Sequence, residues 1–142
     1  MQHTVEADGI PRAAGAYALS IELTHPVSLA RFPGVTLPAG NYVYCGSAYG
    51  PGGLRARVAR HLRQRKTMRW HVDYLTRCGI VRTVLALPGG SECALLSSVL
   101  TCPGTGIPIP GFGSSDCRRC LAHLAAVPKK FDLAGIPVEA LK

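Results

Sequence analysis

The sequence lacks the features of several protein classes. No stretch approaches the roughly 20 consecutive apolar residues that a membrane-spanning helix needs. The N-terminal stretch MQHTVEADGIPRAAG has no basic start followed by a long apolar run, so we expect no secretory signal and a cytoplasmic location. Internal repeats and low-complexity tracts are also missing, which argues against repeat arrays and biased disordered segments.

Negative charge is scarce. The chain has 16 Lys and Arg against 8 Asp and Glu, and between Arg55 and Arg82 the single acidic residue is Asp73. A concentrated basic surface favours a polyanion, because each neutralised phosphate releases counterions. We therefore expect nucleic acid or another phosphate-bearing partner; the alternative is a basic face that is merely solvated. The candidate nucleic-acid-binding residues are Arg55, Arg60, Arg63, Arg65, Lys66 and Arg69.

Length and composition indicate one globular domain. With 142 residues, 47% hydrophobic and 17% charged, the chain can bury a real core. We expect a single domain over residues 1–142, with a loose lead-in at 1–14 and a tail at 127–142. Six cysteines in a chain without a signal argue against a disulfide framework and leave free buried thiols or a metal site.

Apolar and aromatic runs predict the strands. Between residues 16 and 23, large apolar residues alternate with small or polar ones, which is typical of a strand with one packed face. The expected strands are Ala16–Leu23, Val27–Arg31, Asn41–Cys45 and Ile80–Leu87, with a further short strand around Phe131–Leu133. The first three are close in sequence and should pair as an antiparallel meander or hairpin.

Four-residue spacing predicts the helices. Leu54, Val58 and Leu62 form an apolar stripe, while Arg57 and His61 stack on one flank of the same helix. Ser91 is a good N-cap. The expected helices are Leu54–Arg63, Trp70–Arg77, Ser91–Leu100 and Asp116–Ala126. The order of elements predicts an α/β fold, an α+β sandwich in which helices flank a small, largely antiparallel sheet of three to four strands.

Two short signatures resemble those of a known family. Gly15-Ala16-Tyr17 on the first strand and Tyr44-Cys45-Gly46 at the end of the third resemble the paired signature of the GIY-YIG nuclease superfamily. The following Arg57-x-x-Arg60-His61 is similar to a stretch in intron homing endonucleases and DNA-repair incision subunits. The strings YVYCGSAYGPGGLRARVARHLR, WHVDYL and GFGSSDC more closely resemble a compact prokaryotic branch, sometimes fused to an endonuclease III-type glycosylase. The central signature residues differ from the family pattern, and Tyr49–Gly53 lengthens the turn before the helix.

The resemblance implies a GIY-YIG-like fold and a metal-dependent endonuclease that hydrolyses phosphodiester bonds in DNA during repair or processing. It implies Mg²⁺ or Mn²⁺ as cofactor, with RNA not excluded as substrate and a repair glycosylase as a possible partner. Tyr17 would be the base, Tyr44 the second wall of the site, Arg57 the phosphate contact and Glu92 the metal ligand. His61 would assist proton transfer or hydrogen-bond a tyrosine. The alternative is a catalytically inactive nucleic-acid-binding module of the same fold.

Each of these residues also has a structural interpretation. Alternation alone makes Tyr17 and Tyr44 core or cross-strand aromatics, and a base would need a phenol pKa well below its usual ~10. Arg57 could be a solvated helix arginine, and Glu92 a first-turn residue that complements the helix dipole. Asp73 is the rival acid, although with His71 it could instead hydrogen-bond within the fold.

A second cluster combines soft metal ligands. Cys117, Cys120 and His123 follow one another at intervals of three, and Cys102 could return as a fourth ligand for tetrahedral Zn²⁺. The alternative is a set of small buried thiols. Gly111–Asp116 is a glycine loop before the expected last helix, which could bind an anion or simply cap that helix.

Overall fold

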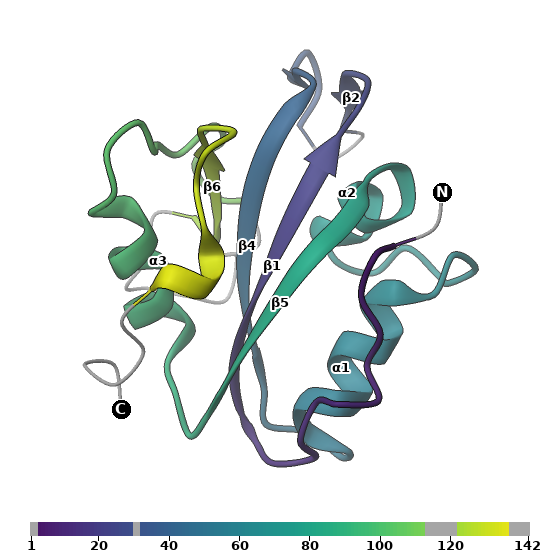
Figure 1. The fold of residues 1–142 in the computed structure, drawn as a ribbon. Coiled ribbons are helices and arrows are strands. Elements are labelled where there is room, and N and C mark those ends of the chain that lie inside the picture. Colours follow the sequence, from purple (N-terminus) through teal and green to yellow (C-terminus); the bar gives the residue numbers. More distant parts are fainter. Residues whose placement is uncertain (1–2, 30–31, 113–121, 137–142) are drawn as a thin grey trace.

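The computed structural model describes residues 3–29, 32–112 and 122–136 and has an antiparallel sheet at its centre (Figure 1). The sheet consists of β1 (Gly15–Leu23), β4 (Gly40–Ala48), β5 (Ile80–Pro88) and β6 (Leu124–Val127), in the order β5-β1-β4-β6. β1 pairs with β4 and β5, and β4 pairs with β6. The short strands β2 (Val27–Ser28) and β3 (Thr36–Leu37) form a separate antiparallel pair. This architecture confirms the predicted α+β fold class.

Helices cover the two faces of the sheet unequally. The described helices are α1 (Gly53–Leu62), α2 (Val72–Cys78), α3 (Glu92–Leu100) and the 3₁₀ turn η1 (Leu133–Gly135). Figure 1 shows α1 and α2 on one side of the sheet and α3 on the other. None of the helices among the described residues has the length and apolarity that a membrane crossing requires.

The alternation along β1 divides the core into two parts. Tyr17, Leu19 and Ile21 pack with residues of α1 and α2, including Leu54 and Leu75. The intervening small residues of β1 face α3 and η1 instead. Large side chains on one face and alanines on the other therefore set which helices each face of the sheet can accommodate.

Several expected elements differ from the observed ones. The prediction of a helix at Asp116–Ala126 is wrong for its described residues, because Leu124–Ala126 pairs with β4 as part of β6. The strand expected around Phe131–Leu133 is instead the turn η1, where the Asp132 carboxylate accepts a hydrogen bond from Ala134 N. β4 does not end at Cys45 but continues to Ala48, since β1 offers it a partner over its whole length. The strand expected at Val27–Arg31 covers only Val27–Ser28 among the described residues.

The N-terminal segment is tied to the domain, although we expected a loose lead-in. Ala13 O accepts a hydrogen bond from Leu54 N at 2.9 Å, and Pro11 O accepts one from Arg55 N at 3.0 Å. The first N–H groups of a helix have no partner within the helix. The segment supplies these partners for α1, where no side-chain cap is present.

Gly53 allows this close approach. A Cβ at Gly53 would lie 2.0 Å from Arg12 O, and its φ of 60° is in the left-handed region that side chains disfavour. Gly50, in the same loop, has open space where a Cβ would be, and its φ lies outside the left-handed region.

We expect Gly53→Ala to lower the free energy of unfolding by about 1–3 kcal/mol, because it combines backbone strain with a clash against the N-terminal segment. Gly50→Ala, the matched control, should change stability by less than about 0.5 kcal/mol. Urea denaturation followed by circular dichroism measures both values. Equal stability of the two variants would contradict the role of Gly53.

Candidate functional site

Three aromatic side chains from separate elements meet on the face of the sheet that α1 covers. The Tyr17 hydroxyl of β1 and His61 Nε2 of α1 are 2.5 Å apart, although 44 positions separate them in the chain. Tyr44 of β4 lies beside both, with ring centroids 6.3 Å from Tyr17 and 6.0 Å from His61. All three side chains are buried. The fold thus brings together both signature tyrosines and the histidine named from the sequence.

Burial determines the protonation of His61. It lowers the pKa of His61 to about 3, with the positive charge of Lys66 adding to the effect and Asp73 opposing it. The imidazole is therefore neutral near pH 7, and its Nδ1 has no hydrogen-bond partner in the described structure. A buried N–H without a partner costs more than a buried acceptor without one. We therefore assign the proton to Nε2, which donates to the Tyr17 oxygen.

The phenols are harder to ionise than in water. Burial raises the pKa of Tyr17 well above 10, and Tyr44 adds to the rise, while Arg57 opposes it through its charge and a hydrogen bond. Burial also raises the pKa of Tyr44, with a further contribution from the charge of Glu92. This direction is opposite to the lowered pKa that a tyrosine base requires. Both phenols are neutral near pH 7 in this structure.

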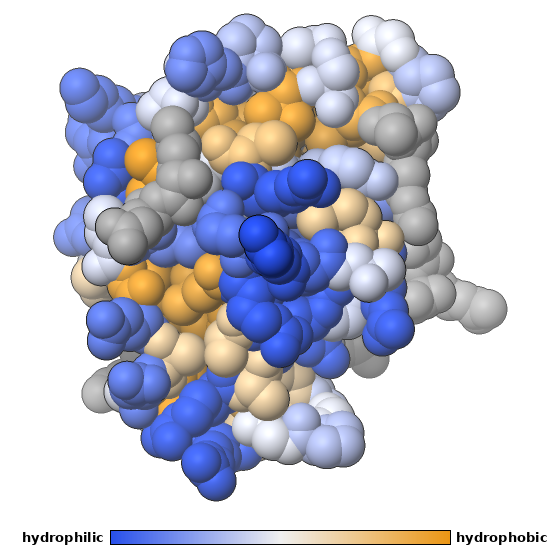
Figure 2. Space-filling view, turned by 90° about the vertical axis from the view of Figure 1, so that its right-hand side faces the viewer, coloured by the Kyte–Doolittle hydropathy of each residue, from blue (hydrophilic) through white to orange (hydrophobic). Residues whose placement is uncertain are grey.

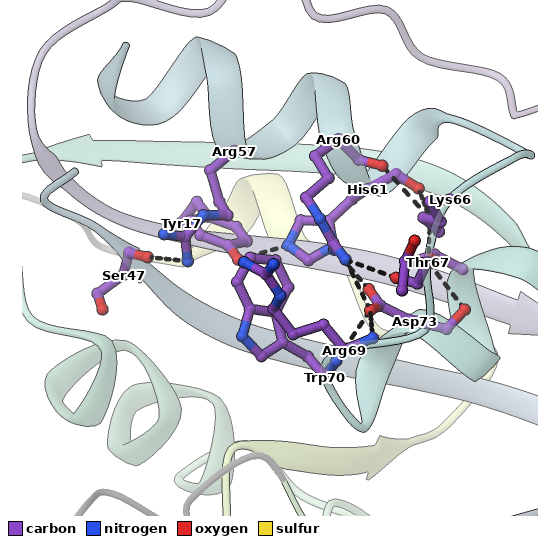
Figure 3. A network of polar contacts seen from close by, with 11 residues as sticks. Tyr17, Ser47, Arg57, Arg60, His61, Lys66, Thr67, Arg69, Trp70 and Asp73 are labelled. Carbon is purple, nitrogen blue, oxygen red and sulfur yellow. Dashed lines mark hydrogen bonds and ion pairs between the residues drawn. The ribbon is translucent and has the colours of Figure 1, made fainter. Parts of the chain in front are cut away.

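Arg57 is held next to the tyrosines by two contacts. Its Nη1 donates to Ser47 O at 3.0 Å, and its guanidinium carbon lies 4.5 Å from the centre of the Trp70 ring. Arg60 stacks on the same indole at 4.0 Å. Figure 3 shows these side chains extending from α1 across the Tyr17–His61 pair. The expected flank of Arg57 and His61 on α1 is therefore directed at the sheet.

A buried carboxylate organises the loop that carries Trp70. Asp73 accepts two hydrogen bonds from the Arg60 guanidinium, at 2.7 and 3.0 Å, and one each from the backbone of Arg69 and Trp70 (Figure 3). Burial alone would raise the pKa of Asp73, but these hydrogen bonds outweigh it and lower the pKa. Four donors occupy the two carboxylate oxygens. Asp73 therefore has a structural role here, and Glu92 is the better candidate for a metal ligand.

Glu92 lies at the N-terminus of α3, where Ser91 caps the helix by accepting from Ala94 N as predicted. Its side chain is 25% exposed, and its Oε2 lies 3.9 Å from His123 Nδ1. The charge of Glu92 contributes to the raised pKa of Tyr44 and, more weakly, of Tyr17. The carboxylate is thus within electrostatic range of both phenols.

Among the described residues, the surroundings of Glu92 fit a metal that keeps most of its water. The described residues contain no group of three or more His, Cys, Asp or Glu that could hold an ion. Mg²⁺ is commonly bound by one or two carboxylates together with water and substrate phosphates. One accessible carboxylate is consistent with such a site and does not suit a metal that needs an all-protein cage.

The candidate nucleic-acid-binding residues divide into two groups. Arg63, Arg65 and Arg69 are exposed. The other three are engaged within the fold: Arg55 donates to Ile10 O, Arg60 pairs with Asp73, and Lys66 donates to His61 O and Thr76 Oγ1. Seen from the side of α1, the surface shows a hydrophilic patch (Figure 2).

The cysteine cluster is described only in part. Cys117 and Cys120 lie outside the described residues, as does most of Gly111–Asp116. Cys102 donates to Ser98 O near the end of α3, whereas His123 lies near Cys93 and Glu92 at its start. Nine residues of helix span ~13 Å, so these two predicted zinc ligands are not adjacent. Zinc stays a prediction.

One cysteine overturns an expectation. Cys93 is disulfide-bonded, so the prediction that the cysteines form no disulfide is wrong at this position. Cys45, Cys78 and Cys102 are free thiols. The prediction was based on the expected compartment of the protein. Whether two cysteines can form a disulfide depends more directly on how close the fold brings them.

Trp70 is the residue of this site that sequence analysis missed. In the sequence analysis, Trp70 was only the expected first residue of a helix. That helix, α2, begins instead at Val72. Trp70 is the single tryptophan of the chain and lies within the basic stretch, a combination that could have suggested a stacking role for arginine.

We expect His61→Gln to flatten the pH dependence of stability. Below pH ~6.5 the unfolded chain binds a proton that buried His61 cannot bind, so the free energy of unfolding falls by up to about 1.4 kcal/mol per pH unit. The cost of His61→Gln should therefore shrink by about 1.6 kcal/mol between pH 6.5 and 5, since the unfolded imidazole is already half protonated at pH 6.5. Urea titrations at each pH measure this difference. His25→Gln, at an exposed position, is the control, and parallel curves for wild type and His61→Gln would contradict the assignment.

Comparisons with known proteins identify a family. The model of a family described as domain of unknown function DUF123 matches residues 16–141. No curated protein and no solved structure matches the chain. Because the matched residues make up most of the chain, the protein belongs to the DUF123 family.

Proposed function

We propose that the protein is a divalent-metal-dependent endonuclease that hydrolyses phosphodiester bonds in DNA. One observation carries the proposal: residues far apart in sequence, which the GIY-YIG resemblance names together, lie within one region of the fold. Tyr17, Tyr44 and His61 are in contact there, and the charges of Arg57 and Glu92 act on both phenols.

Arg57 contributes charge stabilisation. Its guanidinium is partly buried, and the Ser47 carbonyl and the Trp70 ring fix its position. A guanidinium presents several N–H donors in a rigid plane, so donors remain for a phosphate oxygen after Nη1 has bonded to Ser47. A donor fixed before the reaction stabilises developing charge without reorganisation.

Tyr17 contributes a phenolic oxygen that already accepts a hydrogen bond. With the proton of His61 on Nε2, the oxygen accepts from His61, and the positive charge of Arg57 also acts on it. The hydrogen bond and the positive charge both favour the phenolate, and they oppose the effect of burial. A bound Mg²⁺ or Mn²⁺ would supply further positive charge and an acidified water, and Glu92 is the residue that would hold it. Tyr17 is thereby placed to hold or accept a proton beside the phosphate.

The exposed arginines supply a path for the nucleic-acid backbone. Arg63, Arg65 and Arg69 follow the end of α1 in the chain and are exposed, and the backbone of Arg69 donates to Asp73 beside the site. Phosphate contacts of this kind give affinity without reading sequence. The proposed substrate is therefore recognised by its backbone and its shape.

One observation favours the alternative of a binding module without catalysis. Tyr17 is 1% exposed, and its pKa is raised by burial. A protein that binds nucleic acid through the arginines needs neither tyrosine nor Glu92. The two functions differ in whether cleavage accompanies binding.

We expect the purified protein to nick supercoiled plasmid or branched oligonucleotides with Mg²⁺ or Mn²⁺. Tyr17→Phe, Arg57→Ala and Glu92→Gln should each reduce the single-turnover rate by about 100-fold or more, because each removes a group from the reacting region. Quantitative gel electrophoresis measures the rates. Glu6→Gln, at an exposed position that is not among the proposed site residues, is the matched control for Glu92→Gln and should retain full activity.

Two results would contradict this assignment. Undiminished cleavage by all three site variants would exclude these residues from the reaction. Salt-sensitive DNA binding without cleavage, under every metal and substrate tested, would favour the non-catalytic module.

We also expect Arg63→Ala and Arg65→Ala to weaken DNA binding evenly across sequences. Each should lower the slope of log K against log salt by about 0.7–0.9, the value for one lost phosphate contact. Fluorescence anisotropy between about 50 and 200 mM salt measures the slope. Arg82→Ala, which removes an arginine paired with Glu22, is the control and should leave it unchanged.

A further inference from the structure

Tyr49 is exposed without an explanation from packing. It is 62% exposed and is the one large hydrophobic side chain classed as exposed among the described residues. It lies in the segment Tyr49–Gly53 that lengthens the turn between β4 and α1. Neither packing in the core nor the proposed reaction therefore accounts for the Tyr49 ring.

The ring is held in place by its polar end. The Tyr49 hydroxyl donates to Gly90 O at 2.7 Å. Gly90 belongs to the loop before α3, and that loop is itself fixed, since Gly90 N donates to Leu87 O and Gly89 N donates to Ala14 O. The aromatic ring thus spans two loops, one leading into α1 with Arg57 and one leading into α3 with Glu92.

Tyr49 lies close in the chain to the residue that holds Arg57, the proposed phosphate contact. Arg57 Nη1 donates to Ser47 O, two residues before Tyr49. Two extended residues span roughly 7 Å, which is on the scale of one nucleotide. A strand whose phosphate meets Arg57 therefore has an adjacent base within reach of the ring.

A fixed, exposed tyrosine ring is suited to stacking on a flat ligand such as a nucleobase, whichever base it is. Tyrosine gives a large contact area for little conformational entropy, and here the hydroxyl is already bonded, so less is lost on binding. Base–aromatic stacking is the common device by which proteins bind single strands next to a positively charged groove. The Arg57 guanidinium, bonded to Ser47 O next to this turn, provides positive charge there.

We propose that Tyr49 is a stacking platform for an unpaired nucleobase beside the phosphate held at Arg57. The inference rests on the proposed function and narrows its substrate class to single-stranded DNA or to unpaired positions in branched DNA. A base within an intact duplex has both faces stacked on its neighbours and does not present one to the ring.

The test is a binding measurement with the full chain, without added metal so that cleavage plays no part. The probes are a fluorescein-labelled oligothymidylate, the same length of abasic strand, and a blunt duplex. Tyr49→Ala should weaken oligothymidylate binding by about 5- to 100-fold, and Tyr49→Leu by nearly as much, since stacking needs the ring. Tyr49→Phe should stay within a few-fold, because it keeps the ring and loses only the tether.

The abasic strand and the duplex are the internal controls. Tyr49→Ala should change their affinities by less than about twofold, since neither offers a free base. An equal loss on the abasic strand would assign Tyr49 to loop structure and overturn the platform. Thermal melts check that the variants are folded, and Tyr49→Leu, which keeps an apolar side chain, provides a second test of the ring.

The remaining outcomes separate this inference from the proposed function. Unchanged oligothymidylate binding by Tyr49→Ala, together with weakened binding by Arg57→Ala, would overturn the platform and leave the nuclease proposal intact. If Tyr49→Ala also changed the sedimentation coefficient, the ring would be assigned to contact between protein chains. Absence of any DNA binding by the wild type would overturn both proposals.

Discussion

The buried carboxylate of Asp73 is the interaction on which the geometry of the site depends. A charge removed from water must be paired and hydrogen-bonded, and here four donors meet that need. Two of them are backbone N–H groups, so the chain between α1 and α2 has to wrap around the carboxylate. The wrapping places Trp70 beneath Arg57 and Arg60. The position of the Arg57 guanidinium next to the tyrosines therefore follows from the hydrogen bonds that the buried Asp73 carboxylate requires.

The same constraint separates arginines that the sequence cannot tell apart. Arg60 is committed to Asp73 and Trp70, whereas Arg63 and Arg65 remain exposed beyond the end of α1. A basic run thus contains both structural cations and free ones. Counting charge in the sequence gives the field around the molecule, but only the packed structure shows which charges are available to a partner.

The sequence predicted what depends on local periodicity. Alternation along β1 placed Tyr17 on a packed face, and four-residue spacing placed Arg57 and His61 on one flank of α1; the structure confirms both placements. The expectation that only one face of β1 is packed was wrong, because the alanines of the other face pack against α3. It could not predict the strand β6, because Leu124–Ala126 is paired only where β4 offers an edge. Nor could it predict the direction of the tyrosine pKa shifts, which depend on burial by elements distant in sequence. The resemblance named the residues of the site, while the contact of Trp70 with Arg57 arises only in three dimensions.

Glu92 lies near the point where the pairing of β4 with β6 begins. β6 pairs with β4 only over Asn41–Tyr44, and His123 O then accepts one further hydrogen bond, from Cys45 N at 2.9 Å. In the described structure no strand pairs with this edge of β4 beyond that point. The first turn of α3 lies close enough for Glu92 to approach the His123 imidazole and to act on the Tyr44 phenol. An acid carried by a helix on one face of the sheet thus acts on phenols that pack against the helices of the other face.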